Sequence, residues 1–188
     1  MERSFEAVLV EQCATTLAGL KPASLFRYQG ADRRQSREAA ARWAKELAPY
    51  GITVRILKVC PQTGACLIYL YRAGWLRSIL SEPSNRAFLA RQGYQTDQDC
   101  PGLLRQLSRR LCLEREFPHE IGVFLGYPLE DVVGFIENRG RNYTCCGCWK
   151  AYGDPEAARR RFDQYRRCTA ACKERFRRGA PITQLIAA

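Results

Sequence analysis

The sequence lacks several features that would assign it to a common functional class. It contains a single histidine among 188 residues, which excludes a metal site built from two histidines of one chain. It has no run of 18 apolar residues, so it predicts no membrane-spanning helix. It also has no Gly-x-Ser-x-Gly nucleophile motif, no Gly-x-x-x-x-Gly-Lys phosphate loop and no Gly-x-Gly-x-x-Gly dinucleotide motif. The composition, with 46% hydrophobic and 26% charged residues, is typical of a folded globular protein.

The first residues, MERSFE, carry acidic side chains early and no continuous apolar segment. This start is not typical of a secretory signal peptide, so we expect a cytoplasmic location in which thiols stay reduced. The ten cysteines are therefore interpreted as core residues, metal ligands or reactive thiols rather than as disulfides.

The charge balance is strongly basic. The net charge of +11 comes from 30 basic and 19 acidic residues, and only five of the basic residues are lysine. Residues 151–188 hold nearly half of the excess. Arginine favours planar, bidentate partners such as phosphate, so the bias indicates either an anion-binding surface or a general compositional preference.

Periodicity and turn residues predict an α+β fold with a small three-stranded mixed sheet. Apolar residues at helical spacing predict helices at 5–18, capped by Ser4, and from a capping box at Asp32 to about Pro49. Strands are predicted at 23–28, 52–59 and 66–71, the last two joined by a turn at 61–64. We expect a right-handed crossover between the first two strands, with the two helices covering the sheet.

Residues 74–188 are predicted to be mostly helical, and the whole chain, 1–188, to form a single domain whose helix and sheet half is 1–73. Helix candidates lie at 75–80, 84–92, 101–111, 118–125 and 129–138. A cysteine-rich segment at 141–152 has no clear period. A long basic helix at 155–178 begins at Asp154-Pro155, with Asp as cap and Pro in the first turn.

Four stretches of the sequence resemble a known bacterial family, domain-of-unknown-function family 3793. They are residues 13–22 (CATTLAGLKP), 118–128 (PHEIGVFLGYP), 131–136 (DVVGFI) and 146–153 (CGCWKAYG). The resemblance implies an anaerobic bacterial source and a link to iron uptake or to a redox partner such as a flavodoxin. It implies no activity. An aromatic residue is usual in the family where this sequence has Cys148, so a site built on Cys148 would not be general to the family.

Three residues of these stretches carry reactive side chains: Cys13, His119 and Cys146. His119 follows Pro118 at a predicted helix start, where a neutral imidazole is favoured. If the fold brings the three together, they form either a metal or haem site with an open position or a thiolate activated by His119. The structural alternatives are a hydrogen-bonded histidine and a Cys13 buried on a helix face.

A second candidate site is a cluster of thiols toward the C-terminus. Its predicted ligands for zinc, iron or an iron–sulfur cluster are Cys145, Cys146, Cys148, Cys168 and Cys172, with His119. Cys168 and Cys172 are one helical turn apart and share a face. Packing as small hydrophobic residues is the alternative. The dipeptides Cys60-Pro61 and Cys100-Pro101 resemble haem-sensing motifs only weakly, and Cys60 and Cys66 flank the predicted turn.

Candidate anion-binding residues are Lys21 and Lys150, which lie beside predicted loops, and Arg159 and Arg166 on the basic helix. That helix could also lie along nucleic-acid phosphates, although its acidic residues dilute the charge. The sequence thus supports three hypotheses. The first is a redox or iron-linked accessory protein that holds iron, zinc or haem through Cys and His. The second is a Cys/His-dependent enzyme acting on a small anionic substrate. The third is a nucleic-acid-binding module.

Overall fold

The computed structural model describes residues 3–114 and 116–187, and it divides the chain into two compact units. Unit 1 consists of Met1–Gly74 and Arg167–Ala188, and unit 2 of Trp75–Arg166. The boundary near residue 74 lies where the sequence changes from mixed to helical. The long helix α8 (Pro155–Arg177) begins in unit 2 and ends in unit 1, so residues 167–188 belong with the N-terminal half.

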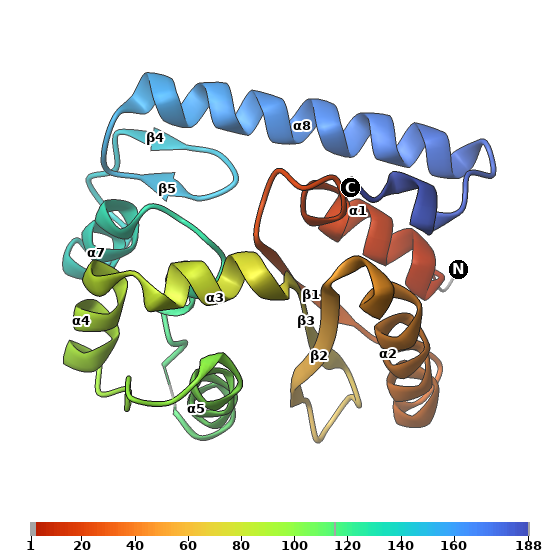
Figure 1. The fold of residues 1–188 in the computed structure, drawn as a ribbon, viewed down its shortest axis with the longest axis horizontal. Helices are drawn as coiled ribbons and strands as arrows, with labels where there is room; N and C mark the ends of the chain where they lie inside the picture. Colours follow the sequence, from red (N-terminus) through yellow and green to blue (C-terminus); the bar gives the residue numbers. More distant parts are fainter. Residues whose placement is uncertain (1–2, 115, 188) are drawn as a thin grey trace. The chain divides into compact units, whose positions relative to one another are not determined.

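Unit 1 is an α+β structure built on a three-stranded sheet (Figure 1). Its strands are β1 (Ala23–Tyr28), β2 (Ile52–Val59) and β3 (Cys66–Arg72), in the order β1-β3-β2. Both hydrogen-bonded pairs are antiparallel. Strands β1 and β2 run parallel but β3 separates them, so the sheet that we expected to be mixed contains no parallel pair within the described residues.

Two helices cover one face of this sheet and form the core of unit 1. They are α1 (Phe5–Leu17) and α2 (Arg33–Leu47), which is followed by a short 3-10 turn, η1 (Ala48–Tyr50). Their apolar residues pack on the side chains of Phe26, Ile68 and Val54, which share one face of the sheet. The C-terminal part of α8 and the 3-10 turn η2 (Ile182–Leu185) complete this core.

Capping side chains fix where these helices begin. The Ser4 hydroxyl accepts a hydrogen bond from the Ala7 N–H at 3.2 Å, as expected for an N-cap. The Asp32 carboxylate accepts from the Gln35 N–H at 2.7 Å, and the Gln35 side chain accepts in turn from the Ala31 N–H at 2.6 Å. Asp32 is therefore the N-cap that the sequence predicts, although the Gln35 side chain reaches the N–H of Ala31, one residue before the cap, rather than that of Asp32.

Unit 2 is mostly helical. Its helices are α3 (Ala73–Ser81), which leads in from unit 1, α4 (Pro83–Arg91), α5 (Cys100–Leu113), α6 (Ile121–Phe124), α7 (Leu129–Glu137) and the first part of α8. The segment without a clear period is a short hairpin of β4 (Cys145–Cys146) and β5 (Lys150–Ala151). Among the described residues of both units, no helix is long and apolar enough to cross a membrane.

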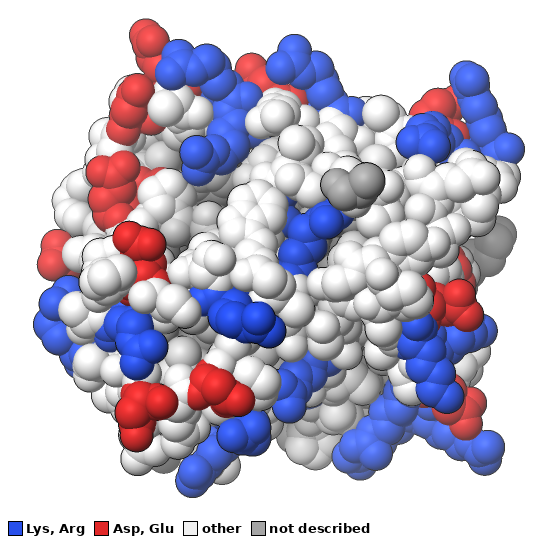
Figure 2. Space-filling model, viewed as in Figure 1, with Lys and Arg blue, Asp and Glu red and all other residues white. Residues whose placement is uncertain are grey.

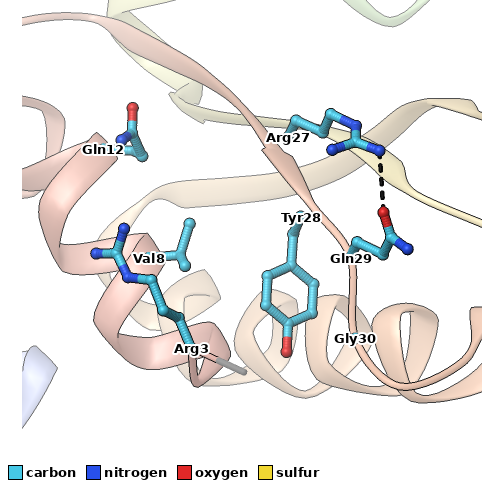
Figure 3. Close-up of a pocket in the computed structure, with 7 residues that line it drawn as sticks. All are labelled: Arg3, Val8, Gln12, Arg27, Tyr28, Gln29 and Gly30. Carbon is cyan, nitrogen blue, oxygen red and sulfur yellow. Dashed lines mark hydrogen bonds between the residues drawn. The ribbon is translucent and has the colours of Figure 1, made fainter. Parts of the chain in front are cut away.

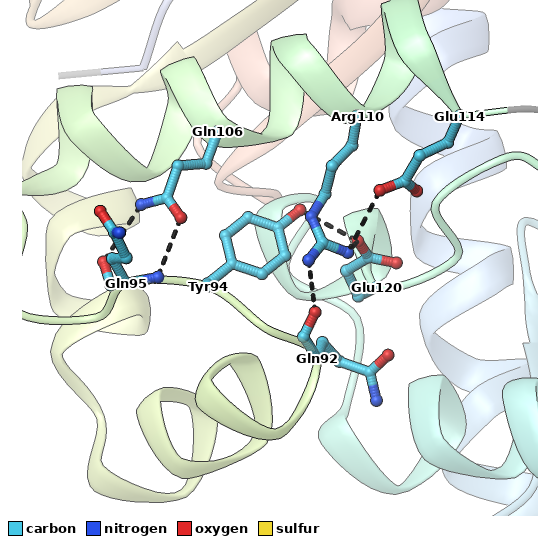
Figure 4. Close-up of polar contacts among 7 residues, drawn as sticks. All are labelled: Gln92, Tyr94, Gln95, Gln106, Arg110, Glu114 and Glu120. Carbon is cyan, nitrogen blue, oxygen red and sulfur yellow. Dashed lines mark hydrogen bonds and ion pairs between the residues drawn. The ribbon is translucent and has the colours of Figure 1, made fainter.

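A buried polar network joins α5 to the segment before α6 (Figure 4). Glu120 is 4% exposed and accepts hydrogen bonds from the Tyr94 hydroxyl at 3.0 Å and from Arg110 at 3.1 Å. The Arg110 guanidinium also lies 4.4 Å from the centre of the Tyr94 ring. Burial, followed by the neighbouring Glu120 charge, raises the pKa of Tyr94, so this phenol stays protonated and keeps donating. Because His119 directly precedes Glu120, the network also fixes the backbone at His119.

The hairpin β4–β5 is held by contacts that reach it from other elements of unit 2. The Trp149 ring stacks on Tyr127 at 5.0 Å and meets Phe162 edge-on at 4.5 Å. Its indole N–H donates to the buried carboxylate of Asp131 at 2.7 Å. A side chain at Gly147 would overlap the Phe162 ring, with a Cβ 2.3 Å from its nearest atom. Tertiary packing therefore shapes this segment.

Candidate functional site

The cysteines predicted as metal ligands fall into two groups that belong to different units. Cys145, Cys146 and Cys148 lie on the β4–β5 hairpin of unit 2, and the last two are exposed. Cys168 and Cys172 share a face of α8 in unit 1. Within residues 3–114 and 116–187, no group of three or more His, Cys, Asp or Glu side chains is arranged to hold a metal ion.

The two cysteines on α8 have the surroundings of packing residues. Cys172 is 6% exposed and belongs to the core of unit 1. The Cys168 thiol donates to the Ala14 carbonyl at 3.8 Å. Burial, followed by the neighbouring Cys172, raises the pKa of Cys168 to about 11. Cys168 is therefore a protonated thiol near neutral pH.

The proposed set of Cys13, His119 and Cys146 is also divided between the units. Cys13 belongs to unit 1, where it is 0% exposed on the core face of α1. Burial raises its pKa to about 12, which leaves almost no thiolate at neutral pH. His119 and Cys146 belong to unit 2, and both are exposed. The His119 ring contacts Phe117 and Phe135, with centroids 5.9 Å and 4.8 Å away.

The predicted anion-binding residues lie in separate places. Lys21 is half-buried in unit 1 after α1, and Arg159 is exposed on α8. Lys150 donates to the Gly140 carbonyl at 2.7 Å, and its ammonium lies 5.0 Å from the centre of the Tyr143 ring. Arg166 pairs with Asp163 of its own helix.

The basic helix carries its own counter-charges. Ion pairs within or just beyond α8 join Arg160 to Glu156, Arg166 to Asp163, and Arg177 and Arg178 to Glu174. Figure 2 shows acidic and basic side chains interspersed along the edge where α8 runs. These pairs reduce the positive potential that the helix offers to a polyanion.

A cysteine outside the predicted sets, Cys60, lies in a turn that is built around its side chain. It follows β2 directly, and the turn from Cys60 to Ala65 leads into β3. The Gly64 N–H donates to the Cys60 carbonyl at 2.9 Å, and the Cys60 N–H donates to the Ala65 carbonyl at 2.8 Å. These bonds curl residues 61–64 around the half-buried thiol.

The turn and a neighbouring strand favour the ionised form of Cys60. The Thr63 hydroxyl, then the backbone N–H groups of Thr63 and Gln62, lower the pKa of this thiol, and the Arg27 charge lowers it further. In its protonated form the Cys60 thiol donates to the Gln62 side-chain oxygen at 3.2 Å. An Arg27 N–H donates to the Thr63 hydroxyl oxygen at 3.5 Å, so β1 contributes a hydrogen bond to the turn that carries Cys60. Burial instead raises the pKa of Cys13, Cys66 and Cys168.

A polar hollow of about 660 Å³ adjoins this turn through Arg27. Figure 3 shows the Arg27 guanidinium facing the Gln29 amide, a hydrogen bond of 3.0 Å, with Arg3 on the other side of the hollow. Gln12 adds a second amide, and the described lining contains no carboxylate, although Arg3 pairs with Glu11 nearby. Two guanidinium groups and two amides suit the anionic end of a small molecule.

From the sequence, Cys60 flanks the predicted turn and belongs to a Cys-Pro dipeptide that resembles a haem-sensing motif only weakly. A stronger local signal was present, because the run Cys60-Pro61-Gln62-Thr63 places a hydroxyl three residues after a thiol at the end of a strand. The contribution of Arg27 could not be read in the same way. It depends on β1 and β2 finishing at the same end of the sheet, where Arg27 and Lys58 both lie opposite Leu67 of β3.

Comparisons with known proteins give one match. No curated protein and no solved structure is detectably similar to this chain. A family model matches residues 9–186, which is nearly the whole sequence and spans both units. The chain therefore belongs to the family described as "Protein of unknown function (DUF3793)".

Proposed function

We propose that this protein is a thiol-dependent redox protein in which Cys60 exchanges with small anionic disulfides. The Cys60 thiolate attacks one sulfur of the disulfide, forms a mixed disulfide and releases the other half as a thiolate. A second small thiolate then attacks the mixed disulfide and returns Cys60 to its free form. Each step forms one sulfur–sulfur bond and breaks one, so no external oxidant or reductant is needed.

The observation that carries this proposal is the placement of donors around one accessible sulfur. The Thr63 hydroxyl and the backbone N–H groups of Thr63 and Gln62 lower the pKa of Cys60, whose thiol donates to the Gln62 side-chain oxygen at 3.2 Å. The hollow beside Arg27 supplies guanidinium and amide groups to the anionic end of a substrate. Arg27 lines the hollow and also bonds to Thr63 of the Cys60 turn, which supports the use of the hollow as the substrate site.

Neighbouring thiols explain why the proposal uses one cysteine. Cys66 lies at the far side of the turn but is 0% exposed and packs in the core of unit 1. Its thiol donates to the Gly64 carbonyl at 3.8 Å, and burial raises its pKa. Cys66 is therefore poorly placed to resolve a mixed disulfide, and a second small thiol serves instead.

Competitive alkylation of the folded, reduced protein tests the proposal. Limiting iodoacetamide at neutral pH, followed by peptide mass spectrometry, ranks all ten cysteines by rate. We expect Cys60 to react first, ahead of the exposed Cys112 and Cys146. Thr63→Val should slow Cys60 several-fold, whereas Thr63→Ser keeps the hydroxyl and should restore most of the rate. A Cys60 that reacts no faster than Cys112 would overturn the proposal.

A further inference from the structure

Five side chains of unit 2 form a row in which each member contacts the next. The row runs Phe117, His119, Phe135, Lys150 and Tyr143. The Phe117 and His119 ring centroids are 5.9 Å apart, and those of His119 and Phe135 are 4.8 Å apart. The Lys150 ammonium lies 5.9 Å from the Phe135 ring centre and 5.0 Å from the Tyr143 ring centre. Residues from the segment before α6, from α7, from the loop after it and from β5 thus form one connected series.

Much of this row faces solvent. Phe117 is 49% exposed and Tyr143 is 45% exposed, and His119 is also exposed. Single exposed aromatic residues are common on protein surfaces, but a connected series of rings with a cation among them is not required for packing. Such a series offers flat faces for stacking beside a positive charge.

The loop that joins α7 to Tyr143 adds charge and has an unusual backbone. Arg139 and Asn142 have positive φ values of 50° and 57°, in a region that residues other than glycine rarely adopt. Gly140 between them has φ 70°, and a side chain there would press on the Phe135 ring. Arg139 and Arg141 are exposed and lie between two aromatic members of the row along the chain. Strained residues of this kind often mark binding loops.

We propose that this row, with Arg139 and Arg141, is a binding platform for single-stranded nucleic acid. Bases stack on the exposed rings of Phe117, His119 and Tyr143, while Lys150 and the two arginines contact the phosphates. Aromatic rings that alternate with cations are the usual means of holding a single strand without reading its sequence. The net charge of +11 favours a polyanion over an uncharged partner.

This site is separate from the basic helix and from the Cys60 turn. Arg160, Arg166, Arg177 and Arg178, which lie on or directly after α8, have acidic partners on that helix, whereas the five members of the row include no carboxylate. Cys60 lies in unit 1 and the row lies in unit 2. Failure of either proposal therefore leaves the other standing.

Fluorescence anisotropy with a labelled oligo(dT) or oligo(U) of about 15 nucleotides tests the platform across a range of salt concentrations. We expect binding at low salt that weakens steeply as salt rises. Phe117→Ala combined with Tyr143→Ala should weaken binding by about fivefold or more, in line with the usual contribution of stacked bases. The matched control is Tyr50→Ala in unit 1, because Tyr50 is also 45% exposed, and this change should have no effect.

Charge variants separate the platform from the helix. Arg139→Gln with Arg141→Gln should weaken binding and reduce its salt dependence, while Arg159→Gln with Arg160→Gln on α8 should change affinity less. Circular dichroism and urea unfolding of each variant confirm that the fold is retained. No binding at low salt, an effect confined to the α8 variant, or equal affinity for a free mononucleotide would each overturn the proposal.

Discussion

Replacing Asp131 with alanine should selectively weaken unit 2, because three hydrogen bonds converge on this one carboxylate. Asp131 lies in the first turn of α7 and is 5% exposed. It accepts from the Trp149 indole N–H at 2.7 Å, the Tyr152 N–H at 2.6 Å and the Gly153 N–H at 3.1 Å. These bonds tie α7 to the end of the β4–β5 hairpin.

The expected loss follows from the donors that the change leaves unpaired. A buried donor without a partner costs about 1–3 kcal/mol, and Trp149, Tyr152 and Gly153 are each only half-buried, so water recovers part of that cost. We expect Asp131→Ala to lower the free energy of unfolding by about 2–4 kcal/mol, because hydrogen bonds to a charged group contribute about 1.5–3 kcal/mol each and the half-buried donors regain water. Asp131→Asn keeps one acceptor oxygen and should cost roughly half as much.

Urea unfolding followed by tryptophan fluorescence and circular dichroism measures this effect. The control is Asp154→Ala, which removes an exposed capping carboxylate that accepts the Glu156 N–H at 2.8 Å and should cost about 1 kcal/mol. A loss for Asp131→Ala no larger than that of the control would refute the view that this carboxylate organises the hairpin.

Three further predictions concern the buried thiol of Cys13, the close contact at Gly134 and the predicted metal ligands. Burial raises the pKa of Cys13 from 9.0 to about 12, so the free energy of unfolding should fall by up to about 1.4 kcal/mol per pH unit as the pH rises between these values. In Cys13→Ala the free energy of unfolding should fall less steeply with pH over the same range. Gly134→Ala places a Cβ 2.4 Å from the Tyr152 ring and should cost about 1–3 kcal/mol in urea unfolding, whereas the more open Gly74→Ala should cost less. The predicted iron, zinc or haem site remains a prediction. Near-stoichiometric metal in anaerobically purified protein, lost on Cys146→Ser, would establish it, and folded protein that takes up no metal on reconstitution would refute it.

The fold of unit 1 is readable from local signals. The β-branched run at 52–59 predicts β2 to the residue, because alternating burial on a sheet and the turn residues at 61–64 are both local properties. The caps at Ser4 and Asp32 predict the starts of α1 and α2 for the same reason. The order of the strands depends instead on which strands pair with each other. Strand pairing is a tertiary property, and the helix between β1 and β2 does not determine it.

The structure of unit 2 differs from the sequence prediction in two segments whose conformation depends on contacts distant in the sequence. The helix expected at 118–125 is reduced to Ile121–Phe124, in a segment anchored by the buried Glu120 network. The hairpin at 145–151 has strands of two residues each, which no periodicity could reveal. The proposed Cys60 site had a local signal in Thr63, but its supporting charge, Arg27, comes from another strand and has no local signal.

We propose that Cys60 is the reacting thiol and that Arg27 helps it select anionic substrates. The most direct measurement compares the rate at which Cys60 reacts with a dianionic aromatic disulfide and with a neutral dipyridyl disulfide, in the wild type and in Arg27→Gln. Arg55→Gln on β2 is the matched control for net charge. We expect Arg27→Gln to lower the ratio of the rate with the anionic disulfide to the rate with the neutral one, and Arg55→Gln to leave this ratio unchanged. Added salt should reduce the difference between the wild type and Arg27→Gln. An unchanged ratio in Arg27→Gln, or reaction spread evenly over the exposed cysteines, would contradict it.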